Sequence, residues 1–371
     1  MRWIQYRLVN KIRTLMLIGL FIGLNQFSFA QTSPEVITLG RDASSIIRAN
    51  KFFIQEVEDK RKIKGASIGN VIFLGKEKNA VMPNPLEKEL TAYWSYSVPK
   101  VNNDLLPLYI SVKDLQLSER RLGPNRVAGE IKLNVSFRWY RDMVPVDLTT
   151  YQTSATYTRP EKEFDHQKLI RQLLDQSLIH FQKWMGSNMG KNPALARNLK
   201  IVFKEIVPSD KADTVFYSVK RPLVWDDFQG QRSRPGSRYA AAVFTSFAYE
   251  GYSYPKDDDL ILEIGLKIFM VKSMSWALSD AKNNGTLRHE QLHFDITRLV
   301  VERFKKNLES GELTIEDYDS EIQYQFLESF REMNTEQENY DRATNHGLNN
   351  AAQAEWERKI AKEIADIYSR Q

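Results

Sequence analysis

The chain of 371 residues contains no cysteine, so neither disulfide bonds nor a lipid anchor on an N-terminal cysteine can form. Histidine is scarce, with five in the whole sequence. The apolar run at residues 15–24 is far shorter than the roughly 20 residues that a membrane-spanning helix needs. The lack of cysteine excludes a disulfide-stabilised fold, the short apolar run favours a cleaved signal over a retained membrane anchor, and the scarcity of histidine makes the position of each one informative.

The first thirty residues have the three parts of an export signal. Basic residues come first, the apolar run follows, and the small residues Ser28 and Ala30 stand where a signal peptidase cuts. We expect cleavage after Ala30 and a mature protein in the periplasm or outside the cell, with no stable membrane insertion. The basic residues of the signal are Arg2, Arg7, Lys11 and Arg13.

The net charge of the mature chain is close to zero. The whole chain has 52 lysines and arginines against 47 acidic residues, and the signal removes four basic residues and no acidic ones, which leaves +1. A protein without a basic surplus releases few counterions from a polyanion. We therefore expect no nucleic-acid partner.

The mature chain is long enough for two domains, and 42% of the residues are hydrophobic. Glycines 186 and 190 and the Asn192-Pro193 step place the boundary near residue 190. Residues 31–190 predict a β-rich α+β domain of unknown role, in which an antiparallel sheet is covered by a helix. The pattern predicts helices near 44–58 and 164–185, and strands at 106–117, 126–139 and 147–158.

Residues 191–371 predict a second α+β domain, because several strands are followed by a run of helices. Strands are expected at 199–207, 214–219, 240–249 and 260–272, and three helices at 287–308, 315–339 and 350–367. The histidines of the first domain, His166 and His180, lie on a predicted helix and are expected to be ordinary helix residues rather than ligands.

One motif in the second domain indicates a metal-binding and catalytic site. His289-Glu290-Gln291-Leu292-His293 matches H-E-x-x-H, in which two imidazoles four residues apart lie one helical turn from each other and can reach one metal ion. Zinc suits these donors and keeps an open position for water in catalytic sites. Glu290 would be the general base that takes a proton from that water. The motif predicts a zincin-like domain with a small twisted sheet and about three helices.

The phase of this helix supports a metal site. The stripe that contains His289 and His293 continues through Ile296, Val300 and Phe304, so both imidazoles should point into the domain. Asp295 lies about 240° around the helix from His289, which makes it a poor ligand for the same ion. Polar and charged residues fall on the other faces, namely Arg298, Glu302 and Lys305.

The third ligand must come from elsewhere. His346 is the favoured candidate, because it is the remaining histidine of the domain and stands beside Gly347, where a helix should end. Asp341 and Glu338 are the alternatives. His346 could equally cap the C-terminus of its helix.

Three segments together resemble a bacterial family that is catalogued as a domain of unknown function and often labelled a predicted secreted zinc-dependent protease. The resemblance covers about residues 200–370. It implies metal binding at His289 and His293, a catalytic role for Glu290, and a site role for the block from Tyr340 to Gly347. Tyr340 is a candidate donor to the oxyanion of the transition state. The three segments are Leu223-Val-Trp225-Asp-Asp227-Phe228-Gln-Gly230, His289-Glu-Gln-Leu-His293-Phe-Asp295 and Tyr340-Asp341-Arg-Ala-Thr344-Asn-His346-Gly347.

The leading hypothesis is a secreted zinc metallopeptidase that acts on a peptide or protein substrate. One alternative is a non-catalytic, zinc-stabilised binding or envelope-assembly protein, which the large first domain without catalytic residues favours. Another is a zinc amidase that acts on cell-wall peptides, because the same water, metal and base serve both reactions. Envelope and cell-wall components are therefore further candidate partners.

Overall fold

The computed structural model describes residues 33–40, 47, 51–206, 208, 212–231 and 239–369. The predicted signal peptide, residues 1–30, lies outside the described residues. Within them, none of the helices is both long and apolar enough to cross a membrane. The chain is a mixed α+β protein, and this confirms the predicted fold class.

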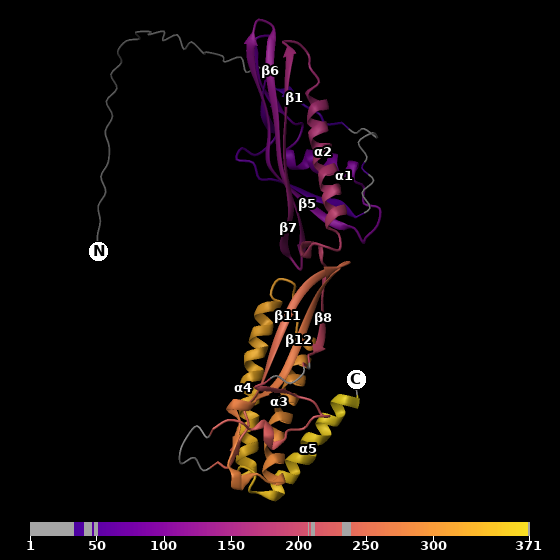
Figure 1. The fold of residues 1–371 in the computed structure, drawn as a ribbon. Helices are drawn as coiled ribbons and strands as arrows, with labels where there is room; N and C mark the ends of the chain where they lie inside the picture. Colours follow the sequence, from indigo (N-terminus) through magenta and orange to yellow (C-terminus); the bar gives the residue numbers. More distant parts are fainter. Residues whose placement is uncertain are drawn as a thin grey trace, which may run out of the picture.

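The N-terminal part is built on one sheet of seven strands, in which three long consecutive strands form an antiparallel meander (Figure 1). The short strands add on one side in the order β1-β4-β3-β5, and β2 pairs with the first half of β5. The strands are β1 (Glu35–Val36), β2 (Phe52–Asp59), β3 (Ser67–Phe73), β4 (Lys76–Val81), β5 (Leu106–Gly123), β6 (Arg126–Arg141) and β7 (Val144–Pro160).

Two helices, α1 (Leu86–Ser97) and α2 (His166–Asn188), pack against this sheet. Alternate residues of β6 point to them, because successive side chains of a strand lie on opposite faces. Phe137 of β6 stacks on Phe181 of α2, with ring centroids 4.7 Å apart. Strands β5, β6 and β7 and helix α2 confirm the four segments that alternation and helical spacing predicted.

The predicted helix near residues 44–58 is wrong over its second half, where Phe52–Asp59 is strand β2. Its neighbour β5 supplies backbone partners from a distant part of the chain, and this pairing overrides the local preference. Gly69 marks a second contact with β5. Its φ is +132°, and a Cβ there would lie 1.8 Å from the carbonyl oxygen of Leu117, so only glycine fits.

The C-terminal part places a small sheet against three helices (Figure 1). Strand β12 lies at its centre, antiparallel to β11 and β9 and parallel to β8. A separate antiparallel pair, β10 and β13, lies next to the helices. The strands are β8 (Asn198–Glu205), β9 (Thr214–Phe216), β10 (Ala241–Ala242), β11 (Thr245–Lys256), β12 (Asp259–Val271) and β13 (Trp276–Ala277).

The long helices of this part are α3 (Asn284–Ser310), α4 (Tyr318–Thr344) and α5 (Asn350–Ser369), which confirm the three predicted helices. Helix α4 runs five residues beyond the predicted end, so that Tyr340 and Asp341 are helical and not part of a loop. One-turn 3-10 helices are η2 (Pro193–Leu195), η3 (Trp225–Asp227), η4 (Lys272–Met274) and η5 (Ser279–Ala281).

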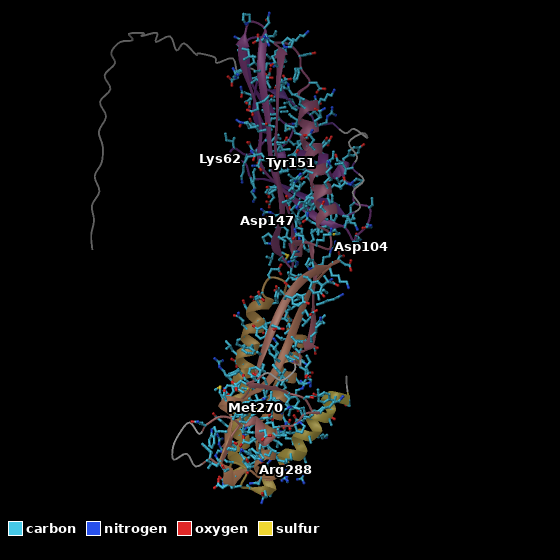
Figure 2. All side chains as sticks on the ribbon, viewed as in Figure 1. Lys62, Asp104, Asp147, Tyr151, Met270 and Arg288 are labelled. Carbon is cyan, nitrogen blue, oxygen red and sulfur yellow. The ribbon has the colours of Figure 1, made fainter. Side chains whose placement is uncertain are left out.

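The two parts are joined end to end, as the ribbon shows (Figure 1). Arg141, at the end of β6, donates to the carbonyl oxygen of Ala196 over 2.9 Å and forms an ion pair with Glu316 of the C-terminal part. On the other side of the junction, Arg197 donates to the carbonyl oxygen of Asp104, which lies at the near end of the N-terminal part (Figure 2).

A buried charged cluster closes the far end of the N-terminal sheet. The Glu119 carboxylate accepts hydrogen bonds from Tyr157, Arg159 and His166 and from the backbone N–H of Ile72, at 2.7–2.9 Å. Burial raises the pKa of Glu119, but the bonds from His166, Arg159 and Tyr157 outweigh it and lower the pKa to about 2. Each oxygen is satisfied, so this cluster stabilises the sheet.

Replacing Glu119 by glutamine should lower the free energy of unfolding by about 3–5 kcal/mol, because Arg159 is then left buried without its counter-charge. The matched control is Glu130→Gln, which removes an exposed pair with Lys132 and should cost less than about 1 kcal/mol. Denaturant unfolding at pH 7 measures both, and equal losses would contradict the role given to the cluster.

The lowered pKa of Glu119 predicts that the stabilisation by this carboxylate depends on pH. The folded-state pKa of Glu119 lies below its usual 4.5, so its stabilisation is fully present above pH 4.5 and is lost as the pH falls toward 2. The stability difference between the wild type and Glu119→Gln should therefore narrow over that range in thermal unfolding at stepped pH.

Candidate metal centre

Helix α3 starts beside the site. The side chain of Asn283 caps it by accepting a hydrogen bond from the backbone N–H of Thr286 at 3.0 Å. His289 and His293 follow on the buried face, and Ile296, Val300 and Phe304 continue the same stripe without exposure to solvent. The structure confirms that both imidazoles point into the domain.

Three side chains converge at this point, and the third is Asp341 of α4. Its Oδ1 atom lies 3.1 Å from Nε2 of His289 and 3.0 Å from Nε2 of His293. Ligand atoms that are 2.0–2.1 Å from one tetrahedral ion lie about 3.3 Å apart, so the spacing fits three donors around a single metal ion. Among the described residues, these three form a group that could hold a metal ion.

The neighbours of His289 decide which ring nitrogen faces the site. The Gln353 side chain donates through Nε2 to the Glu357 carboxylate, which can only accept, so its Oε1 atom faces His289. Nδ1 of His289 lies 3.1 Å from that oxygen and therefore carries the proton. Nε2 of the neutral ring then presents a lone pair to Asp341. A cation, either a second proton or a metal ion, must lie between two such acceptors.

The charges of the site are consistent with this arrangement. Burial lowers the pKa of His289, but the Asp341 carboxylate and Glu290 outweigh it and raise the pKa above its ordinary value. Burial likewise opposes ionisation of Asp341, yet the hydrogen bonds with His289 and His293 hold its pKa far below the usual range. The site therefore keeps a carboxylate facing two imidazoles. Nδ1 of His293 is buried without a hydrogen-bond partner among the described residues.

Glu290 lies next to the histidines at the edge of strand β10. Its Oε2 atom accepts a hydrogen bond from the backbone N–H of Val243 at 2.9 Å, and the side chain is buried. Burial is the main cause that raises the pKa of Glu290. Such a carboxylate is suited to accept a proton near neutral pH.

Tyr340 lies behind His289 rather than in front of it. The two rings stack with centroids 4.6 Å apart, and the Tyr340 hydroxyl donates to Oε1 of Gln353 at 2.9 Å. Tyr340 has no exposed surface, and burial raises the pKa of its hydroxyl. This hydroxyl is placed to hold Gln353 and His289, and it does not line the cavity described below.

His346 lies in the turn after α4, in which three residues in a row have positive φ. Its Nδ1 atom is 3.5 Å from Oδ2 of Asp341, and this is not the carboxylate oxygen that contacts His289 and His293. The ring of His346 packs edge-on to Tyr239. The geometry favours Asp341 over His346 as the third ligand. A side chain in place of Gly347 would be strained, because the φ of this residue is +80° and a Cβ would lie 3.2 Å from His289.

Outside the site, helix α3 contacts the segment from Leu223 to Gly230, which includes Trp225, Asp227 and Phe228. Gln291, inside the H-E-x-x-H motif, accepts a hydrogen bond from the backbone N–H of Leu223 and donates to Asp295. Asp295 also accepts from Tyr217, so it holds neighbouring segments together, and burial raises its pKa. Sequence patterns gave no reason to single out Gln291 or Gln353, because amides carry no metal-binding signature.

A cavity of about 840 Å³ opens onto the three donors and Glu290. Its walls are β10 and the residues that flank it, the N-terminal turn of α3, one face of α4 and the turn after α4. Glu338, the remaining alternative for the third ligand, lies on this wall of α4 but outside the group of three donors.

Asp341→Asn should weaken zinc affinity by more than about 100-fold, because even residues that only orient a ligand contribute 10–100-fold. His346→Asn should change that affinity by only a few-fold. Competition with a zinc chelator measures both variants in the full chain. If His346→Asn releases the metal and Asp341→Asn retains it, the assignment of the third donor is wrong.

Gln353→Leu should weaken zinc affinity by about 10–100-fold, since the variant no longer fixes the His289 proton on Nδ1. Gln323→Leu, on an exposed face of α4, is the control and should bind zinc like the wild type. An unchanged affinity in Gln353→Leu would contradict the tautomer argument.

Comparison with known proteins matches a family model to the segment that carries the three donors. No curated protein matches the chain. Among solved structures, protein XCC0632 from Xanthomonas campestris, of family DUF330, matches 42% of this chain and 98% of its own at 14% identity, with a TM-score of 0.25, which is too low to support an argument. Residues 274–347, which include all three donors, match the family described as "Bacterial protein of unknown function (DUF922)".

Proposed function

We propose that this protein is a secreted or periplasmic zinc-dependent metallopeptidase that hydrolyses peptide bonds. One observation carries the proposal. Two imidazoles and a carboxylate converge within reach of one ion, and a buried Glu290 lies beside them at the floor of an open cavity.

The donor set fits zinc. Three protein ligands of this kind, with the fourth position open, are typical of catalytic zinc sites, whereas structural sites have four protein ligands. His289, His293 and Asp341 would hold the ion. Zinc bound there would polarise a substrate carbonyl and lower the pKa of a water molecule.

Glu290 is the proposed general base. The backbone N–H of Val243 fixes one of its oxygens, which orients the carboxylate and leaves the other oxygen for proton transfer. Burial favours the protonated form after that transfer, so Glu290 can hold the proton until it passes to the leaving amine.

Strand β10 is positioned to hold an extended substrate. The carbonyl oxygen of Ala240 accepts from Leu278 on the β13 side, whereas the N–H of Val243 points to Glu290. Backbone groups of successive strand residues alternate in direction, so those of Ala241 face the same side as Val243. Among the described residues β10 pairs only with β13, and this edge can therefore pair with a peptide.

The export signal expected at residues 1–30 supports a location in the periplasm or outside the cell, where the substrate would be a peptide, a protein or the peptide part of an envelope component. Residues 31–190 adjoin the C-terminal part where α3 ends and α4 begins, whereas the three donors lie near the opposite ends of these helices (Figure 1).

Glu290→Gln should keep the metal and lower kcat by about 100- to 10,000-fold, the range in which a general base contributes. Zinc content and peptide turnover are measured on the same preparation. Glu309→Gln, on an exposed position of α3, is the matched control and should turn over like the wild type. Unchanged turnover in Glu290→Gln would contradict the proposal.

A further inference from the structure

We propose that Glu338 is a specificity-determining residue and that the cavity prefers polar peptides with a cationic side chain, such as that of lysine or arginine, next to the scissile bond. This inference rests on the proposed peptidase function and names the substrate class of that same site.

Glu338 lies on the face of α4 that lines the cavity. Asn334, Glu338 and Asp341 follow one another at intervals of four and three residues, so they form a single stripe along the helix. Glu338 precedes Asp341 by three residues, which is a rise of about 4.5 Å along the helix axis. This distance is slightly more than the length of one extended residue, and it places Glu338 beside the reacting bond of a bound peptide.

Apart from the three histidines, the ionisable residues that line the cavity are all acidic. Lysine and arginine do not occur among the described residues that line the cavity, whereas three acidic residues do. Asp341 faces the two histidines and Glu290 is held by Val243. Glu338 is exposed, and no ion pair or hydrogen bond engages its carboxylate within the described part of the chain. Its charge is thus available to a ligand.

Within the described structure, no basic residue of α4 neutralises the charge of Glu338. Arg342 is one turn further along α4, at the spacing that favours an ion pair, but it is exposed and does not line the cavity. No ion pair joins the two side chains in the described structure.

The wall formed by β10 and its flanking residues leaves room for a long side chain. Between Tyr239 and Val243 it has three alanines, whose methyl groups occupy little of the cavity. The remaining lining is rich in amides, which hydrogen-bond to peptide groups and do not offer an apolar pocket. These amides are Asn283, Asn334, Gln337, Asn345 and Asn350.

Binding and cleavage test this inference separately. Blocked alanine pentapeptides that carry lysine, norleucine or glutamate at the centre are titrated against the full zinc-loaded chain with Glu290→Gln. The lysine peptide should bind about 2- to 5-fold more tightly than the norleucine peptide, the range of an exposed ion pair, and the difference should shrink at high salt.

Further variants isolate Glu338. In the same background, Glu338→Gln should abolish the preference for lysine, and Glu338→Lys should reverse it in favour of glutamate. Glu355→Gln, an exposed position of α5 that does not line the cavity, is the control and should retain the wild-type order. Equal binding of the three peptides, no binding of any of them, or a preference that survives Glu338→Lys overturns the inference.

Cleavage by the chain with Glu290 intact then separates the two proposals. Lysine-selective binding without turnover of any of these peptides or of a mixed peptide library supports the subsite and counts against the peptidase. Turnover that depends on Glu290 but ignores lysine supports the peptidase and overturns the role of Glu338.

Discussion

The Asp341 carboxylate, held between His289 and His293, is the contact on which the candidate site depends. It joins α4 to α3 at a point where neither helix could complete a metal site alone. The charge of Asp341 raises the pKa of His289, and the imidazoles in turn keep Asp341 ionised. Because a carboxylate and a lone pair repel at this distance, the arrangement requires a cation between them, either a proton or a metal ion.

Behind this contact, a chain of neutral hydrogen bonds fixes the orientation of His289. Tyr340 and Gln353 come from two different helices, and together they determine which ring nitrogen faces the cavity. Gly347 completes the support, because its missing side chain lets the turn after α4 close against the imidazole. A site held in this way is rigid on one side and open on the other, where β10 and the polar face of α4 form the walls.

Different interactions stabilise the N-terminal part. Its long strands bury alternate apolar residues under two helices, and its charged cluster at Glu119 is satisfied by side chains from strands and a helix that are far apart in sequence. Within the described residues, it meets the C-terminal part at the junction, where Arg141 contacts Ala196 and Glu316 and Arg197 contacts Asp104. The donors of the candidate site and the residues that support them therefore all belong to the C-terminal part.

The sequence by itself determined the elements whose periodicity is strong, namely β5 to β7, α2 and the three C-terminal helices, and it placed His289 and His293 on the buried stripe of α3. It misjudged residues 52–58, where pairing with a distant strand decided the outcome. It favoured His346 over Asp341, because His346 is the remaining histidine of the domain and stands where a helix should end. Only the tertiary structure brings the Asp341 carboxylate to α3. The buried Arg298, expected on an outer face, pairs with Glu302 one turn along α3 and with Glu205 of β8. The contact with Glu205 joins distant segments and follows from packing, which local spacing cannot specify.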